Sequence, residues 1–413
     1  MKKLVSLLLT IVLLSTLVAS SAFAEDKVTI EILSLKNEQA AQDAFNELFA
    51  GFQKQYPNVE FNLQSMTSDQ LKTTMRARAA SGDMPDIVTW MKEFEPEYLT
   101  DLSGQAFLAN LNADTVKGAN ATYTDGIYAM PIDNGYIGMF YNKDVLAANN
   151  VALPTTLAEL RTACETLKNN GVTPFATGCL DLSVPYIGLI GLFAETVYGQ
   201  IPDWSAKRDA DEVTFATSAE WKQAFDLLKE FVYGYSDLDN TFNMSYDDAA
   251  AKFATGGAAF YIQGNWALSA IRTANPDVNM GICAIPVFDT ADQAKLLAFP
   301  DTSLSVTKDA KNKDMAMKFL EYMTSAEAGE IWSKDVKVSS AVNGVNVAYD
   351  PIASDINSYL SSGKFTPYGD RVLRSVFTDK LWEDYSKVML DTETWDQLAA
   401  DLDTFWVKAR DGK

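Results

Sequence analysis

Residues 125–154 read DGIYAMPIDNGYIGMFYNKDVLAANNVALP. An apolar run ending at 130–131 (Met-Pro) precedes a polar break at 133–135 (Asp-Asn-Gly), and a second apolar run covers 136–141. Strands and helices alternate before this stretch, and the same alternation begins again after it. Because one α/β unit ends with a strand just where another begins, the polar break predicts a hinge between two lobes.

The first 24 residues have the pattern of a secretory signal peptide. Two lysines precede an apolar run over 4–18, and alanines at 22 and 24 supply the small residues of a cleavage site. The run is shorter than the roughly 20 apolar residues of a membrane span, and no later stretch approaches that length. We therefore expect cleavage after Ala24 and a mature chain that is periplasmic or otherwise extracytoplasmic.

The composition narrows the functional classes. A chain of 413 residues is too long for one typical core, so two lobes are expected. The formal net charge of −21 disfavours nucleic acid and anionic membrane surfaces as partners. The sequence has no histidine, which removes the commonest general base and most transition-metal sites. An enzymatic mechanism would therefore have to rely on paired carboxylates.

The three cysteines, an odd number, leave at least one thiol unpaired. Cys164 lies on a predicted helix, and Cys179 follows the next predicted strand. From the turn that these elements share, the helix rises about 1.5 Å and the strand about 3.3 Å per residue. The two positions then differ by more than about 10 Å, beyond the roughly 7 Å limit for a bridge. We expect buried free thiols, with a Cys164–Cys179 disulfide as the alternative.

The segment from 28 to 90 follows a β-α-β-α-β order. Apolar spacing predicts strands at 28–33, 59–63 and 86–90, and helices at 41–56 and 71–79. This order implies a parallel, doubly wound sheet with right-handed crossovers. Such sheets bind ligands at the carboxyl ends of their strands. The segments where we expect ligand contacts are therefore 34–38, 90–95 and 133–136.

A similar pattern follows the polar break. Thr156 and Glu159 form a predicted capping box for one helix, and Ser245 with Asp248 begins another. Later elements are predicted as a helix at 219–233, a strand at 258–262, a strand and helix within 303–333, and a mostly helical segment at 368–411. Both halves of the chain therefore have α/β character.

Aromatic residues are the main positive signal for a ligand. Four of them fall at or just past the end of a predicted strand: Trp90, Tyr136, Tyr186 and Trp266. Sugar rings are held by flat aromatic faces together with planar hydrogen-bonding side chains. Trp266, at a helix start after a glycine, is the strongest candidate. The competing interpretation is that these strand aromatics belong to the core.

Two acidic clusters allow other interpretations. Glu93, Glu95 and Glu97 lie along one short loop, a spacing that does not place two carboxylates across a scissile bond. One acceptor for a sugar hydroxyl with solvated neighbours fits this loop better. Residues 237–243 lack the glycine and the distal glutamate of a calcium loop. We therefore expect no catalytic residue, no metal and no cofactor.

Six short motifs occur in order along residues 25–413. They are FQKQYP at 52–57, GDMPDIV at 82–88, DGIYAMP at 125–131 with YNKD at 141–144, FATGGAA at 253–259 with GNW at 264–266, KNKDMAMKFL at 311–320 and SAVNG at 340–344. Together they resemble the extracellular solute-binding proteins of bacterial ABC importers, in the carbohydrate-binding group that includes maltose-binding proteins.

The resemblance implies roles for particular residues. Trp266 matches a ring-stacking aromatic residue, and Glu93 matches an acidic sugar ligand. Other ligand positions match the loop after the first strand, a second-lobe loop and the return to the first lobe, namely Asn37, Glu38, Asp181, Tyr186, Asp301 and Ser303. Asn134 and Tyr136, which flank Gly135 in the hinge, complete the expected ligand-binding set.

Two departures from the family pattern refine this expectation. Gly135 lies where maltose binders of the family carry an acidic ligand, which argues against maltose itself. Ser20 stands where lipoprotein relatives carry the lipid-modified cysteine, which argues for a protein without a lipid anchor.

The expected fold is α/β and periplasmic-binding-protein-like, with two doubly wound lobes joined by a three-crossing hinge around a ligand cleft. Lobe 1 is expected to comprise 25–133 and 302–342, and lobe 2 to comprise 137–298 and 346–413. The expected function is to bind a sugar or oligosaccharide, as a monomer, and deliver it to a membrane permease. The alternatives are the same fold binding a polyamine, phosphoester, iron or peptide, and a carbohydrate-active enzyme.

Overall fold

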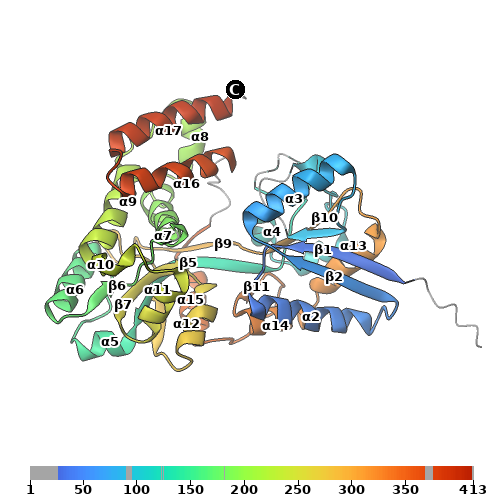
Figure 1. Cartoon of the computed structure of the whole chain (residues 1–413), viewed down its shortest axis with the longest axis horizontal. Helices are drawn as coiled ribbons and strands as arrows, with labels where there is room; N and C mark the ends of the chain where they lie inside the picture. Colours follow the sequence, from blue (N-terminus) through green and yellow to red (C-terminus); the bar gives the residue numbers. More distant parts are fainter. Residues whose placement is uncertain are drawn as a thin grey trace, which may run out of the picture.

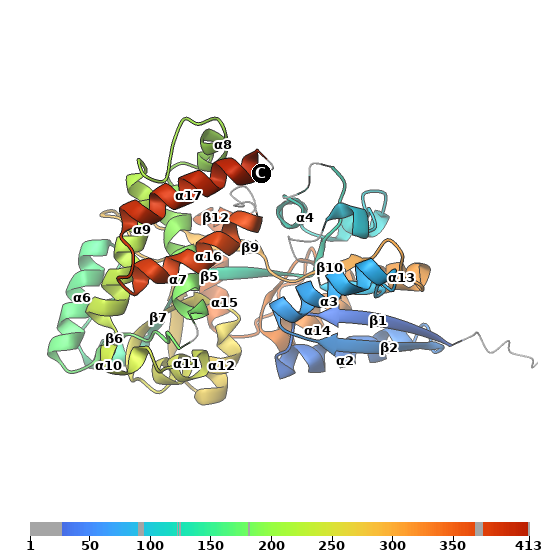
Figure 2. The same ribbon diagram turned by 45° about the horizontal axis from the view of Figure 1, so that its top comes forward.

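The strands of the computed structural model form two sheets that lie side by side, with the long strand β5 (Asp133–Asn142) running between them (Figure 1; Figure 2). The structure describes residues 27–89, 95–121, 123, 125–180, 182–367 and 375–411. Within these ranges, every helix is too short or too polar to cross a membrane.

The first sheet has the predicted β-α-β-α-β order at its start. Its strands in spatial order are β2 (Val59–Ser65), β1 (Val28–Ser34), β3 (Ile87–Thr89), β10 (Ser303–Val306) and β4 (Met130–Pro131). β1 pairs in parallel with both β2 and β3, as predicted. β10 runs antiparallel to β3 and β4 because the chain enters it on returning from the second sheet.

The helices around the first sheet bury the apolar face that the sequence predicts. In α2 (Gln39–Gln53), Phe45, Leu48 and Phe52 are fully buried, and Phe49 stacks on Phe61 of β2 with 4.0 Å between ring centroids. The other helices here are α3 (Ser68–Ser81), η1 (Pro96–Tyr98), η2 (Ala106–Asn110), α4 (Ala113–Ala119), α13 (Lys313–Met323) and α14 (Ala326–Val336).

The second sheet is organised around β5. Its strands in spatial order are β12 (Phe365–Pro367), β9 (Leu296–Pro300), β5, β7 (Ala258–Gly264) and β6 (Thr173–Phe175), while β8 (Met280–Cys283) and β11 (Ser339–Ser340) also pair with β5. β5 is antiparallel to all four of its partners. This one strand therefore holds together elements that lie far apart in the sequence.

The polar break predicted at 133–135 is not a break in the backbone. β5 begins at Asp133 and continues through Gly135 to Asn142 without interruption, and only Ile132 separates it from β4. The prediction of a joint between two runs was wrong in this respect. Polar residues are tolerated in the strand because its first residues pair with β9 and β11, so their backbone groups are hydrogen-bonded.

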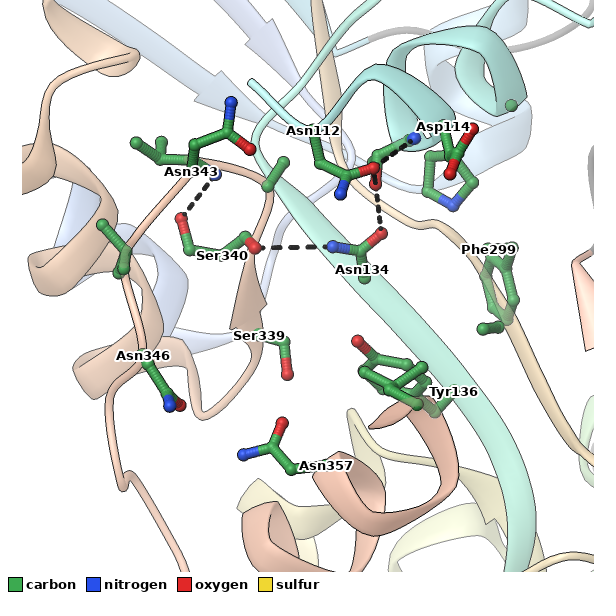
Figure 3. A pocket seen from close by; sticks show the side chains of 18 of the residues that line it. Asn112, Asp114, Asn134, Tyr136, Phe299, Ser339, Ser340, Asn343, Asn346 and Asn357 are labelled. Carbon is green, nitrogen blue, oxygen red and sulfur yellow. Dashed lines mark hydrogen bonds between the residues drawn. The ribbon is translucent and has the colours of Figure 1, made fainter. Parts of the chain in front are cut away.

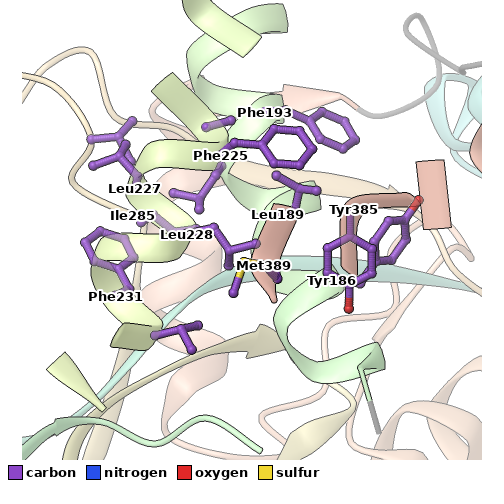
Figure 4. Close-up of a cluster of buried hydrophobic side chains, with 14 of the residues drawn as sticks. Tyr186, Leu189, Phe193, Phe225, Leu227, Leu228, Phe231, Ile285, Tyr385 and Met389 are labelled. Carbon is purple, nitrogen blue, oxygen red and sulfur yellow. The ribbon is translucent and has the colours of Figure 1, made fainter. Parts of the chain in front are cut away.

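The helices of the second sheet enclose a core rich in aromatic residues (Figure 4). The helix predicted at 219–233 buries four residues at helical spacing, namely Trp221, Phe225, Leu228 and Val232. The helices are α5 (Lys143–Ala148), α6 (Leu157–Asn169), α7 (Ser183–Phe193) continuing into η3 (Ala194–Tyr198), α8 (Trp204–Asp209), α9 (Ala219–Lys229) continuing into η4 (Glu230–Gly234), α10 (Leu238–Thr241), α11 (Tyr246–Ala254), α12 (Ala267–Ala274), α15 (Ile352–Ser361), α16 (Ser375–Met389) and α17 (Trp395–Arg410).

All three cysteines are buried as free thiols. Burial raises the pKa of Cys179 and of Cys283 to about 12 and raises the pKa of Cys164 even further above its ordinary value. Because the thiolate is the reactive form, these thiols are protonated and unreactive at neutral pH.

The packing of β5 predicts a strong dependence on Gly138. A Cβ at this position would lie 2.6 Å from the Cys283 carbonyl oxygen and 2.8 Å from a Leu296 methyl carbon. We expect Gly138→Ala to lower the free energy of unfolding by about 1–3 kcal/mol, because the backbone of β8 must shift. Urea denaturation measures the change. Gly104→Ala, which meets nothing within 4 Å, is the control, and an equal loss in both variants would contradict the packing argument.

Candidate functional site at the hinge

Three chain crossings meet around the Asp133 carboxylate, which is fully buried. Its Oδ1 accepts a hydrogen bond from the backbone N–H of Thr302 at 2.6 Å, and its Oδ2 accepts one from Nε1 of Trp332 at 2.7 Å. Beside it, the Ile132 N–H donates to the Thr302 carbonyl, and the Ala341 N–H donates to the Ile132 carbonyl. The Asp133 side chain thus links the crossings at 132–133 and 301–302 to Trp332, and the backbone of Ile132 joins the crossing at 340–341.

A second carboxylate and one ammonium group lie next to Asp133. Nζ of Lys36 is 2.8 Å from Oδ2 of Asp301. Burial by itself lowers the pKa of Lys36, but the negative charges of Asp301, Asp133 and Glu38 outweigh burial and hold that pKa above its ordinary value. Lys36 therefore stays protonated.

The same arrangement has the opposite effect on Asp133. Burial, and then the negative charge of Asp301, raise the pKa of Asp133 to about 6, although Lys36 and the two N–H donors oppose the shift. Both carboxylates interact with the same ammonium group, and the pKa that rises is that of the fully buried Asp133. Asp133 consequently titrates near neutral pH, which the sequence pattern did not indicate.

One face of β5 carries Gly135 and Ile137, and Trp266 lies over this face. A Cβ on Gly264, which pairs with Ile137, would lie 2.2 Å from the indole of Trp266. The indole contacts Phe299 edge-on, with 6.0 Å between ring centroids, and a Cβ at Gly135 would meet the Phe299 ring and Asp301. The half-buried Trp266 ring and the Lys36–Asp301 pair therefore lie on one side of β5, here called the Trp266 face.

The opposite face of β5 carries Asn134 and Tyr136 and lines a pocket of about 650 Å³, here called the hinge pocket (Figure 3). Its other walls come from α4, from α15, from Ala298 to Pro300 and from residues 339–349. Successive residues of a strand point to opposite faces. The structure therefore does not bring Asn134 and Tyr136 to the side that holds Trp266.

The remaining predicted residues are distributed unevenly. Asn37 and Glu38 are exposed in the loop before α2, close enough to Lys36 for Glu38 to affect its pKa. Ser303 is buried within β10. Tyr186 is buried under α16, against Trp382 and Tyr385 (Figure 4). The structure therefore groups Asn37, Glu38 and Asp301 near the hinge and places Ser303 and Tyr186 in the interior.

Two predicted ligand residues, Glu93 and Asp181, lie outside the described residues, as does Trp90. Among the residues that are described, no three His, Cys, Asp or Glu side chains are grouped so as to hold a metal ion. Asp237, in the acidic segment considered for calcium, pairs instead with Lys252 at 2.5 Å.

Comparison with known proteins gives this geometry its context. Residues 36–330 match the family of bacterial extracellular solute-binding proteins. The chain belongs to this family. The family resemblance predicted from the six motifs is thereby confirmed.

Two relatives with similar sequences span most of the solute-binding protein. One is the multiple sugar-binding protein of Streptococcus mutans, 26% identical over 379 residues, covering 87% of this chain and 82% of the relative. Another is the melibiose/raffinose/stachyose-binding protein MelE of Bacillus subtilis, 24% identical over 359 residues, covering 84% of this chain and 81% of the relative.

Solved structures support the fold of this solute-binding protein. A chitin oligosaccharide binding protein superposes with a TM-score of 0.79 at 20% identity, covering 94% of this chain and 100% of that one. RafE in complex with raffinose superposes with a TM-score of 0.75 at 20% identity, covering 92% of this chain and 99% of RafE. The predicted α/β, periplasmic-binding-protein-like fold class is confirmed.

Sequence reasoning missed two residues of the solute-binding protein that the structure brings forward. Lys36 lies within the segment 34–38, where ligand contacts are expected, but the sequence does not distinguish it from a solvated lysine. Trp382 was passed over because it lies within a helical pattern. Its ring is 40% exposed and rests edge-on against Tyr186, with 4.5 Å between ring centroids. Because exposure is a property of packing, the sequence held no signal for this tryptophan.

The hydrogen bond from Trp332 to Asp133 predicts a pH-dependent effect of Trp332→Phe. Loss of a donor to a charged acceptor costs about 1.5–3 kcal/mol, more than loss of a donor to a neutral one. Asp133 is ionised above its pKa of about 6 and protonated below it. We therefore expect the stability lost in this variant to be about 1 kcal/mol greater at about pH 7.5 than at about pH 5.

Denaturant unfolding of wild type and variant at both pH values measures this difference. Trp204→Phe is the matched control, because Nε1 of the equally buried Trp204 donates to the neutral hydroxyl of Ser218 at 2.9 Å. Its loss of stability should not change with pH. A pH-independent loss in Trp332→Phe would show that Asp133 does not titrate in this range.

Proposed function

We propose that this protein is the extracytoplasmic binding component of an ABC importer and that it binds a sugar or oligosaccharide on the Trp266 face of the hinge. The observation that carries the proposal is the half-buried indole of Trp266, held against the hinge strand beside the charged pair of Lys36 and Asp301. No bond is broken in this function, and the protein acts by binding and release.

The chemistry of this face suits a saccharide. A pyranose ring presents C–H groups on its faces, which pack on a flat aromatic ring such as Trp266. Its hydroxyls need donors and acceptors around the ring edge. Lys36 supplies N–H donors, while Asp301 and Glu38 supply carboxylate acceptors. Only Oδ2 of Asp301 contacts Lys36, so its other oxygen can accept from a hydroxyl.

The names of the relatives support the sugar class. The two relatives compared above are described as binding multiple sugars and melibiose, raffinose or stachyose. Melibiose, raffinose and stachyose are neutral saccharides of two or more rings, long enough to contact more than one stacking surface. The membrane partner that receives the sugar would be the permease of the importer, as for this class of binding protein.

The lobes are proposed as 25–133 with 302–342 and 137–298 with 346–413. Apolar residues of the first set form two buried clusters, and those of the second set form others. Sugar bound on the Trp266 face would contact both lobes and favour their approach by rotation about the crossings at Asp133. The approach of the lobes would then be the signal that the permease reads.

Trp382 provides a second platform for a longer ligand. α7 lies near both tryptophans, since Ile187 and Ile190 pack against the same buried cluster as Trp266, while Tyr186 supports Trp382. We propose that one ring of the saccharide stacks on Trp266 and that a further ring reaches Trp382. A preference for oligosaccharides over monosaccharides would come from contact with both tryptophans.

The Trp266 assignment predicts that Trp266→Ala weakens sugar binding by at least about a hundredfold, roughly 2.7 kcal/mol. Calorimetric titration with the saccharide found in a thermal-shift screen measures it. Trp266→Phe keeps a flat face and should retain most of the affinity. If Trp266→Ala binds as well as wild type, the stacking role is refuted. If only polyamines, phosphoesters or Fe(III) stabilise the protein in the screen, the sugar function itself is refuted.

The Trp382 platform predicts a length-dependent effect. Trp382→Ala should weaken a tri- or tetrasaccharide by about tenfold, near 1.4 kcal/mol, and leave a mono- or disaccharide nearly unaffected. Titration of wild type and variant with raffinose, stachyose and melibiose measures the difference. Leu390→Ala, at another exposed apolar residue of this region, is the control. Equal weakening for all chain lengths would contradict a distal platform.

A further inference from the structure

The hinge pocket is built by parts of the chain that move relative to one another when lobes rotate. β5 contributes Asn134 and Tyr136, α4 contributes Asn112 and Thr115 from the side of the first sheet, and α15 contributes Asn357 from the side of the second. The volume of about 650 Å³ lies within the range of small-molecule sites. β5 lies between the pocket and the Trp266 face, and Phe299, which contacts Trp266, also borders the pocket.

Hydrogen-bonding groups that point into the hinge pocket are partly unused. Oδ1 of Asn134 accepts from the Thr115 hydroxyl at 3.0 Å, and the Ser339 hydroxyl lies 3.4 Å from that of Tyr349. Across from them, Asn346 and Asn357 are exposed, and the described residues offer their amides no hydrogen-bond partner. Figure 3 shows both amides at the pocket wall. They are a donor and acceptor set ready for a ligand.

The charge and the rings of the pocket define the class of that ligand. Asp114 and Lys117 of α4 are the charged residues that line it, and their charges cancel. Tyr349, which is half-buried, offers aromatic surface beside the amides. Flat rings with uncharged amides and hydroxyls suit a neutral polyhydroxylated molecule, whereas they offer an anion or cation no compensating charge.

We propose that the hinge pocket is a second binding site, for a neutral polyol or a small saccharide, and that its occupancy opposes binding on the Trp266 face. Rotation that brings the lobes together on the Trp266 face moves α4 and α15 apart behind β5. A ligand that contacts both helices loses one of its walls in that movement. This coupling, unlike the second site itself, rests on the proposed function.

A test of the second site uses fluorine NMR of the fluorotyrosine-labelled full-length mature protein carrying Trp266→Ala, with Tyr349→Phe to assign the Tyr349 signal. The probes are sorbitol, glucose and sucrose. We expect at least one of them to shift the Tyr349 signal saturably, with a Kd on the order of millimolar. The second site would be overturned if no probe gave a saturable shift, either in this variant or in the protein that retains Trp266. That result would not affect the proposed site on the Trp266 face.

Variants of α15 show whether the shift arises in the hinge pocket. Asn357→Phe fills the pocket and should abolish the shift of the Tyr349 signal. Asn357→Ala adds no bulk and should weaken the affinity for the probe by about fivefold or more. Ser358→Phe, on the same helix and exposed but outside the pocket, is the control and should leave it unchanged. A shift that persists in both Asn357 variants would overturn the assignment.

The coupling is measured by titrating the sugar of the Trp266 site with and without a saturating hinge-pocket probe. We expect the affinity to fall by about fivefold or more, and to be restored by Asn357→Phe. An unchanged affinity would overturn the coupling. If no sugar binds the Trp266 site at all, the proposed function and the coupling fail together, and the Tyr349 titration still decides the second site.

Discussion

The burial of the Asp133 carboxylate at the meeting of three chain crossings is the constraint on which this structure depends. A carboxylate in the interior is tolerated only when donors and counter-charge surround it. Thr302, Trp332 and Lys36 meet this requirement from three different parts of the chain. The crossing at 301–302 and the helix that carries Trp332 are therefore fixed to the same carboxylate, and the backbone of Ile132 pairs with Ala341 of the third crossing beside it.

The alternation of β5 then divides the hinge into two chemically different faces. Trp266 lies on the face of Gly135, Asn134 and Tyr136 line the hinge pocket on the other, and Phe299 packs on Gly135 and borders both. Because one strand separates the faces, a rotation that narrows one widens the other. Under the proposed function, affinity on the Trp266 face would therefore depend on groups behind the hinge as well as on those that touch the ligand.

Local features of the fold were predictable because they depend on neighbours in sequence. The helices begin at the expected caps, such as Thr156 and Ser245, and α3 ends at Gly82 with a left-handed backbone. The parallel order of β1, β2 and β3 followed from alternation of elements. The antiparallel insertion of β10 did not follow, since it depends on where a distant segment returns.

The sequence by itself determined the family, the α/β class and Trp266 as the leading aromatic candidate, because motifs and periodicity are local and survive in a linear reading. Only the tertiary structure decided that 133–135 is continuous strand, that Asn134 and Tyr136 point away from Trp266, that Tyr186 is buried beneath Trp382, and that Lys36 joins Asp301. These facts depend on strand pairing and on contacts between distant segments. Facing direction and burial are properties of packing, and a linear pattern does not contain them.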